Sequence, residues 1–99
     1  MLASKKIVFL INDITALGGT ERMCTLIANA LSSAEFTVTI ISRYESNAAP
    51  FFVLNEAVQR VSLFSKAPSL MEQLSMPLRL YRRVMRIAPT IIVSCDTQM

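Results

Sequence analysis

The stretch KIVFLINDITALGGTER, residues 6–22, decides the fold of this chain. It opens with an unbroken aliphatic and β-branched run over residues 6–11, which is typical of a strand buried on both faces of a parallel sheet. Residues 12–19 interrupt this run with Asn, Asp, Thr and two adjacent glycines. A helical pattern starts immediately afterwards. A buried strand, a glycine turn and a helix in this order are the opening of an α/β unit.

The helix after the turn has its own start and stop signals. Thr20 is the expected N-cap, because its hydroxyl can accept a hydrogen bond from a free amide in the first turn. Glu21 lies in that first turn, where the helix dipole favours a negative charge. Ser32 and Ser33 are expected to end the helix. Its apolar residues recur at the spacing of one α-helical face: Met23, Leu26, Ile27, Ala30 and Leu31.

The rest of the chain continues the alternation of strands and helices. Residues 36–42 are dense in β-branched side chains and predict a second strand, and residues 43–56 are irregular. Pro77 lies inside a helical region, where it removes an amide and predicts a break at Met76. We expect a third strand over residues 57–64 and a second helical region over residues 68–88. A fourth strand is expected over residues 90–94, with the apolar composition of a buried strand.

The order β-α-β-β-α-β predicts a Rossmann-like α/β fold with a parallel-type sheet. The chain stops directly after the fourth predicted strand, whereas a doubly wound sheet normally continues with a helix and further strands. We therefore expect residues 1–99 to form a partial N-terminal Rossmann-like domain, an incomplete half. The composition, 53% hydrophobic and 17% charged, is rich in apolar residues for so short a chain. An intact but unusually apolar small domain would show the same composition.

Absent residue types exclude several chemistries. The chain has no histidine, which removes Ser-His and Cys-His nucleophile pairs and any His-containing zinc site from it. Cys24 and Cys95 have neither metal nor redox spacing, and we expect two buried thiols, no disulfide and no metal site. The net charge of +3 permits a phosphate ligand or an anionic surface without requiring nucleic acid. No apolar run is long enough for a spanning helix, so a cytoplasmic location is expected.

The adjacent glycines are the most informative local feature. Gly18 and Gly19 can adopt positive φ and allow a ligand to approach the backbone closely. Free amides at the start of the following helix would face a phosphate at the carboxyl edge of the sheet. The Gly-x-Gly-x-x-Gly dinucleotide fingerprint and the Gly-Lys-Ser/Thr phosphate loop are both absent. A tight strand-to-helix turn with no ligand is the alternative explanation of the pair.

Six segments in order carry a family resemblance: KIVFLIN, GGTER, IANAL, VTIIS, PFF and RIAPTIIVS, at residues 6–12, 18–22, 27–31, 38–42, 50–52 and 86–94. Together they resemble the N-terminal region of family-4 retaining glycosyltransferases, bacterial enzymes of capsule, exopolysaccharide and lipopolysaccharide assembly. The resemblance implies the GT-B fold, in which two Rossmann-like domains face each other across a cleft. The N-terminal domain of that fold mainly binds the acceptor, and the C-terminal domain holds the sugar nucleotide.

The resemblance also implies which residues bind the donor and which parts of the enzyme lie outside residues 1–99. Gly18 and Gly19, with help from Thr20, would contact the donor phosphate and the transferred sugar, which makes the nucleotide sugar a substrate and leaves no cofactor. The family's paired glutamates and nucleotide pocket lie in the C-terminal domain, which residues 1–99 lack, and a histidine of its N-terminal half would fall beyond Met99. We therefore expect no catalytic residue in this chain and no sugar transfer by the chain alone. In the full-length enzyme the partners would be a nucleotide sugar and a glycan or lipid-linked acceptor.

A basic cluster lies in the second helical region. Its four arginines follow three-to-four-residue spacing and share one face, with Leu78, Tyr81, Val84 and Met85 opposite: Arg79, Arg82, Arg83 and Arg86. A basic amphipathic helix can lie on an anionic membrane, which would place the protein peripherally at the inner face of the plasma membrane. The solvated outer face of a sheet-covering helix is the plainer explanation.

Two other functional classes fit parts of the sequence. A non-catalytic Rossmann-like module could use the same loop for a phosphorylated ligand, or self-associate through exposed apolar surface. A nicotinamide- or flavin-dependent oxidoreductase is disfavoured because the dinucleotide fingerprint fails.

Overall fold

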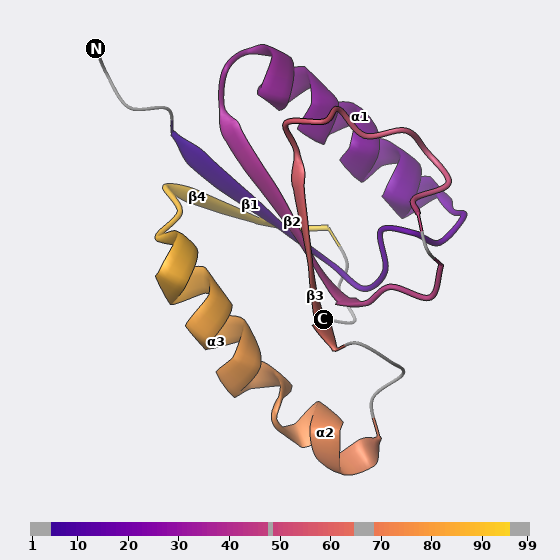
Figure 1. Ribbon diagram of the computed structural model, residues 1–99, viewed down its shortest axis with the longest axis vertical. Helices are drawn as coiled ribbons and strands as arrows, with labels where there is room; N and C mark the ends of the chain where they lie inside the picture. The colour runs from indigo at the N-terminus through magenta and orange to yellow at the C-terminus, as the bar shows by residue number, and fades with distance from the viewer. Residues whose placement is uncertain (1–4, 48, 65–68, 96–99) are drawn as a thin grey trace.

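The computed structural model describes residues 5–47, 49–64 and 69–95 (Figure 1). Four strands form one sheet in the order β3-β2-β1-β4, and every neighbouring pair is parallel. The strands are β1 Lys6–Ile11, β2 Thr37–Tyr44, β3 Gln59–Phe64 and β4 Ile91–Ser94, and the helices are α1 Gly19–Ser33, α2 Leu70–Leu74 and α3 Met76–Ile87. This confirms the predicted Rossmann-like α/β fold with a parallel sheet. None of the helices in these ranges is long and apolar enough to cross a membrane.

The sheet has a different covering on each face (Figure 1). One face packs against α1 and the segment that joins β2 to β3, around a core that includes Phe9, Ile40 and Ala28. The other face packs against α3, around Val8 and Ile41. Successive residues of β1 point to opposite faces, and both sets are buried, which explains why its sequence is a continuous apolar run.

Helix α1 does not use the expected face against the sheet. Its buried residues are Cys24, Thr25 and Ala28, whereas Met23 and Ile27 are 58% and 44% exposed. Small side chains on the sheet-facing side allow the helix to approach the strands closely, and the larger ones lie along its flank. The 3.6-residue pattern identifies the apolar stripe of the helix correctly, but the sheet covers only one side of that stripe.

The second helical region breaks at Ser75, where α2 ends and α3 begins. Pro77 lies in the first turn of α3, a position at which the missing amide costs no hydrogen bond, so the predicted break is confirmed. The residues packed on the sheet are Met76, Leu80, Val84 and Ile87. Of the apolar face expected from the sequence, only Val84 packs there, and Leu78, Tyr81 and Met85 are exposed.

The fourth strand was expected to be buried, and this prediction is wrong. β4 pairs with β1 alone and forms one edge of the sheet. Ile91 aligns with Ile7 and Ile92 with Val8, so the two isoleucines project to opposite faces, and each is about half exposed, at 46% and 49%.

A segment without regular structure joins β2 to β3 on the α1 side of the sheet (Figure 1). Asn29 of α1 donates from its side chain to the Val53 carbonyl at 2.9 Å and accepts from the Asn55 amide at 2.7 Å. Leu54 and Val58 pack on the core beneath, whereas Phe51 and Val53 point outwards. The irregular connection therefore takes the place that a crossover helix would fill.

Candidate functional site

Gly18, not Thr20, is the N-cap of α1. The helix begins at Gly19, so Thr20 lies inside the first turn, and the N-cap residue Gly18 makes no side-chain capping hydrogen bond. Gly18 has φ −171° and ψ 173°, an extended conformation open to any residue, and no glycine in the described ranges has positive φ. The expected N-cap role of Thr20 is therefore wrong, and so is the expected use of glycine for a left-handed turn.

Neither glycine places a side chain of its own at the start of α1, and the Glu21 carboxylate lies beside Gly18. The first main-chain hydrogen bond of the helix runs from the Arg22 amide to the Gly18 carbonyl at 3.1 Å, which leaves the amides of the preceding turn without a helical acceptor. A Cβ on Gly19 would meet nothing within 4 Å. A Cβ on Gly18 would meet Oε1 of Glu21, a flexible side-chain end that can move aside. Open amides at a positive helix end suit an anion, although Glu21 must turn away to admit one.

This helix start lies at one end of a groove between α1 and β4. The groove has a volume of about 460 Å³. Gly19 and Thr20 line it together with Ser94, the last residue of β4, and Cys95, which follows it. The other described lining residues have apolar side chains: Phe9, Met23, Cys24, Ile27, Leu31 and Val93. The strand order reverses between β1 and β4, and open α/β sheets bind ligands in the crevice at such a point.

A polar network braces the loop that leads to the glycines. The Asp13 carboxylate accepts from the Thr15 amide at 2.9 Å, from the Ser46 amide at 3.1 Å and from both hydroxyls. Asn47 donates from its side chain to the Thr15 carbonyl at 3.1 Å. The loops after β1 and β2 are thereby tied together. The sequence alone identifies Asp13 only as a loop residue, because its partner Ser46 is 33 positions away.

These contacts shift the pKa of Asp13. Burial is the largest single influence and acts to raise it, but the hydrogen bonds from Ser46 and Thr15 together outweigh burial and lower the pKa below its ordinary value of 3.8. The network therefore favours an ionised Asp13 at neutral pH.

Ser42 of β2 holds the same loop through a buried hydrogen bond. Its buried hydroxyl oxygen accepts a 3.1 Å hydrogen bond from the Ile14 amide, and both residues are fully buried. Ile14 thus enters the α1-side core, which holds the chain between β1 and the glycines against the sheet.

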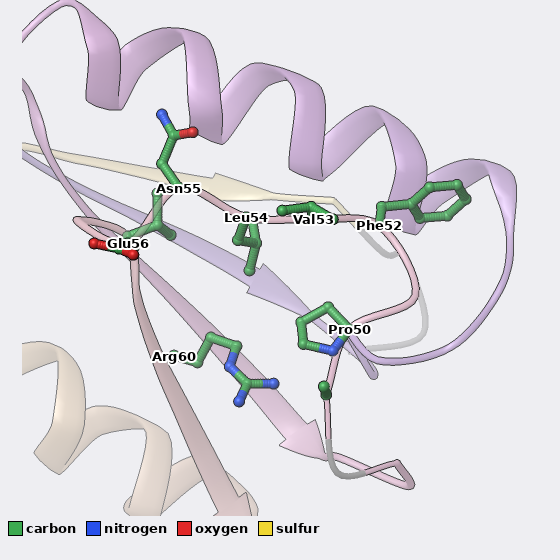
Figure 2. Close-up of a pocket in the computed structure, with 9 residues that line it drawn as sticks. Pro50, Phe52, Val53, Leu54, Asn55, Glu56 and Arg60 are labelled. Carbon is green, nitrogen blue, oxygen red and sulfur yellow. The ribbon is translucent and has the colours of Figure 1, made fainter.

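A second hollow, of about 330 Å³, lies under the segment between β2 and β3 (Figure 2). Arg60 of β3 and Pro50 face it, while the ring of Phe52 points away from Arg60. Arg60 pairs with Glu45 at 3.6 Å, and Oε2 of Glu45 is buried with no hydrogen-bond partner. Burial raises the pKa of Glu45 more than Arg60 lowers it. With its one cation already paired, this hollow is a weaker anion site than the start of α1.

The four arginines of α3 do share one surface. Arg79, Arg82, Arg83 and Arg86 line a hollow of about 180 Å³ together with Leu63. This hollow lies on the α3 side of the sheet, whereas the glycine loop belongs to the α1 side, so the structure separates the two sets of predicted site residues (Figure 1).

The two cysteines lie in contact, which sequence spacing did not indicate. A hydrogen bond between the side chains of Cys24 and Cys95 raises the pKa of Cys24, and burial raises it further. The two cysteines do not form a disulfide bond; Cys24 is buried and Cys95 is only partly buried, so the expectation of two buried thiols holds for Cys24 alone. Both line the groove beside the glycine loop, where the raised pKa keeps the Cys24 thiol neutral.

Gly19→Ala should stabilise the chain. The residue is helical and its Cβ would project into open space, so the alanine restricts the unfolded chain at no steric cost, which is worth about 0.4–1 kcal/mol. Urea unfolding followed by circular dichroism measures the change. Gly18→Ala is the control, since its Cβ meets Glu21 and its gain should be smaller. Destabilisation by Gly19→Ala would show that Gly19 is strained or packed.

Comparison with known proteins supports the fold. No protein-family model and no curated protein matches the sequence. Among solved structures, the chain is similar to WaaG, a glycosyltransferase involved in lipopolysaccharide biosynthesis, with a TM-score of 0.67 and 12% sequence identity. The match covers 89% of this chain and 23% of WaaG, so the chain spans about a quarter of that protein's length.

The parallel sheet and this match define a Rossmann-like α/β fold of the kind found in part of a glycosyltransferase. At 12% identity the likeness to WaaG concerns the fold alone.

Proposed function

We propose that this chain is the N-terminal part of a family-4 retaining glycosyltransferase that transfers a sugar from a nucleotide sugar to a surface-polysaccharide or lipid-linked acceptor. The observation that carries the proposal is the uncapped start of α1, open to the crevice between β1 and β4. The fold likeness to a lipopolysaccharide glycosyltransferase supports the same class.

The proposed chemistry at this site is recognition of the donor. The amides of Gly19 and Thr20 would donate to the diphosphate of the nucleotide sugar, whose negative charge increases as the sugar departs. Backbone amides held by a helix need no reorganisation to stabilise that charge. The rest of the groove, with its apolar lining, would lie beside the acceptor. The groups that bind the nucleotide, and the paired glutamates, would belong to a second Rossmann-like domain.

The gene and the purified chain together test this proposal. We expect the reading frame to continue beyond codon 99 into a second Rossmann-like half with spaced glutamates, and we expect the 99-residue chain to transfer no sugar from any nucleotide sugar. A stop at codon 100 would contradict the assignment to a two-domain enzyme. Turnover by the purified chain would contradict the placement of its catalytic groups elsewhere.

Peripheral contact with the cytoplasmic face of the membrane forms part of the same proposal. Three apolar residues of α3, Leu78, Tyr81 and Met85, are more than half exposed, and the arginine hollow lies on the adjacent side of the same helix. A helix that exposes apolar and basic residues together suits an anionic lipid surface, where a lipid-linked acceptor would be found.

A non-catalytic module that self-associates is the second candidate. The observation in its favour is the groove beside β4, in which none of the described lining residues is charged, together with the half-exposed isoleucines of that edge strand. A stop at codon 100 with a dimeric or larger product in sedimentation analysis would favour this candidate.

A further inference from the structure

Helix α3 has three distinct sides. One packs on the sheet through Leu80 and Val84. A second carries the arginines at positions 79, 82, 83 and 86, whose three- and four-residue spacing places them on one broad face around one hollow. A third exposes the large apolar residues Leu78, Tyr81 and Met85. The residues named on the second and third sides are exposed in the described structure.

The arginine side is a concave site built on one fixed guanidinium group. Arg79 lies 4.7 Å from the centre of the Phe64 ring, donates from Nε to the Ser75 hydroxyl at 3.2 Å and reaches the Leu63 carbonyl at 3.5 Å. These three contacts orient Arg79 against the end of β3. Arg82, Arg83 and Arg86 complete the wall of the hollow.

Among the described residues, no carboxylate lines this hollow. The ion pair between Arg60 and Glu45 lies at another site. Four guanidinium groups around one hollow repel one another, and an anion bound between them removes that cost. Arginine is suited to binding phosphate, because its planar guanidinium group can donate two parallel hydrogen bonds to two phosphate oxygens.

The size of the hollow limits the ligand. About 180 Å³ is less than the roughly 300–1,000 Å³ of pockets that enclose whole drug-sized molecules, so the site would hold a headgroup and not an extended sugar chain. A terminal phosphate carries a charge of about −1.5 to −2 at neutral pH and has three exposed acceptor oxygens. A phosphodiester has one negative charge and fewer free oxygens.

We propose that the hollow formed by Arg79, Arg82, Arg83, Arg86 and Leu63 binds a terminal phosphate or diphosphate group. The exposed apolar side of α3 lies next to it and would receive the hydrocarbon part of a ligand that has one, so a lipid with a phosphomonoester or diphosphate headgroup fits both sides. The lipid source rests on the membrane contact proposed above, whereas a free phosphate compound would occupy the hollow alone.

Co-sedimentation of the 99-residue chain with vesicles tests this inference. The probes are phosphatidylcholine vesicles alone, vesicles with phosphatidic acid, which has a terminal phosphate, and vesicles with phosphatidylglycerol, a diester, adjusted to equal surface potential. We expect about fivefold or greater preference for phosphatidic acid over phosphatidylglycerol, because the paired donors distinguish the two headgroups where charge does not. Inorganic pyrophosphate, added as competitor, should reduce binding to phosphatidic acid.

Two double variants distinguish binding in the arginine hollow from a nonspecific effect of positive charge. Arg82→Gln with Arg83→Gln should abolish the preference, and both positions are exposed, so the fold should remain intact by circular dichroism. Lys5→Gln with Lys6→Gln removes the same charge from exposed positions at the start of β1 and should retain the preference.

The possible outcomes distinguish a phosphate site from a general membrane contact. Equal binding to the two anionic vesicles refutes a phosphate site while leaving the membrane contact in place. Pyrophosphate binding that the arginine variant abolishes, without binding to any vesicle, supports the hollow with a free phosphate compound as its ligand and refutes the lipid source. Absence of binding to every probe overturns both.

Discussion

Phe9→Ala is expected to remove about 3–5 kcal/mol of folding free energy, the usual cost of deleting a buried phenyl ring. Phe9 is 1% exposed in the central strand and belongs to the core between the sheet and α1. A domain of this size is stable by only about 5–15 kcal/mol, so the variant should lose roughly a fifth or more of its stability. Urea unfolding monitored by circular dichroism measures the difference.

Phe51→Ala provides the matched control. It deletes the same atoms from a ring that is 62% exposed and touches mainly Phe52, edge to face at 5.1 Å between centroids. We expect a cost of about 0.5 kcal/mol or less, as for other surface substitutions. Similar losses for the two variants would mean that the sheet is not packed as described.

Asp13→Asn is expected to destabilise the chain by about 1.5–2 kcal/mol near neutral pH, since hydrogen bonds to a charged acceptor are stronger than neutral ones. The substitution removes the charge and one of the two acceptor oxygens on which Thr15 and Ser46 converge. The loops after β1 and β2 should loosen together, and the turn leading to Gly18 with them.

The pH dependence of this effect has a definite sign. The pKa of Asp13 is lowered in the folded chain, so its contribution is complete above the ordinary value of 3.8 and is lost as the pH falls through the folded value. The stability difference between wild type and Asp13→Asn should therefore shrink on going from about pH 7 to about pH 3. Glu56→Gln, at an exposed carboxylate, is the control and should show little difference at either pH. A difference that stays constant with pH would exclude the carboxylate network.

The sequence predicted those parts of the fold that depend on neighbouring residues. The apolar run at 6–11 became the central strand, and Pro77 ended one helix and began the next, because both effects act within a few residues. The side of α1 that meets the sheet was not predictable in the same way. It depends on how closely Cys24, Thr25 and Ala28 allow the helix to approach strands that lie elsewhere in the sequence.

The candidate site shows the same division. The position of the glycines after β1 and at the start of a helix was predicted, and the structure confirms that location. Their conformation was not, since an extended Gly18 serves the turn as well as a left-handed one. The bracing of Asp13 by Ser46 could not be predicted, because it depends on two loops meeting at one edge of the sheet. The role of Gly18, Gly19 and Thr20 in binding a donor stays a prediction.

The position of β4 in the sheet has a consequence for the order in which the chain folds. Its pairing with β1 aligns Ile7 with Ile91, residues at opposite ends of the chain, whereas β1 and β2 are joined by one helix and β2 and β3 by one connection. Closing the longest loop costs the most chain entropy, and few buried contacts of β4 offset it. The first three strands can therefore assemble as a nucleus, with β4 as the last strand to join and the first to leave.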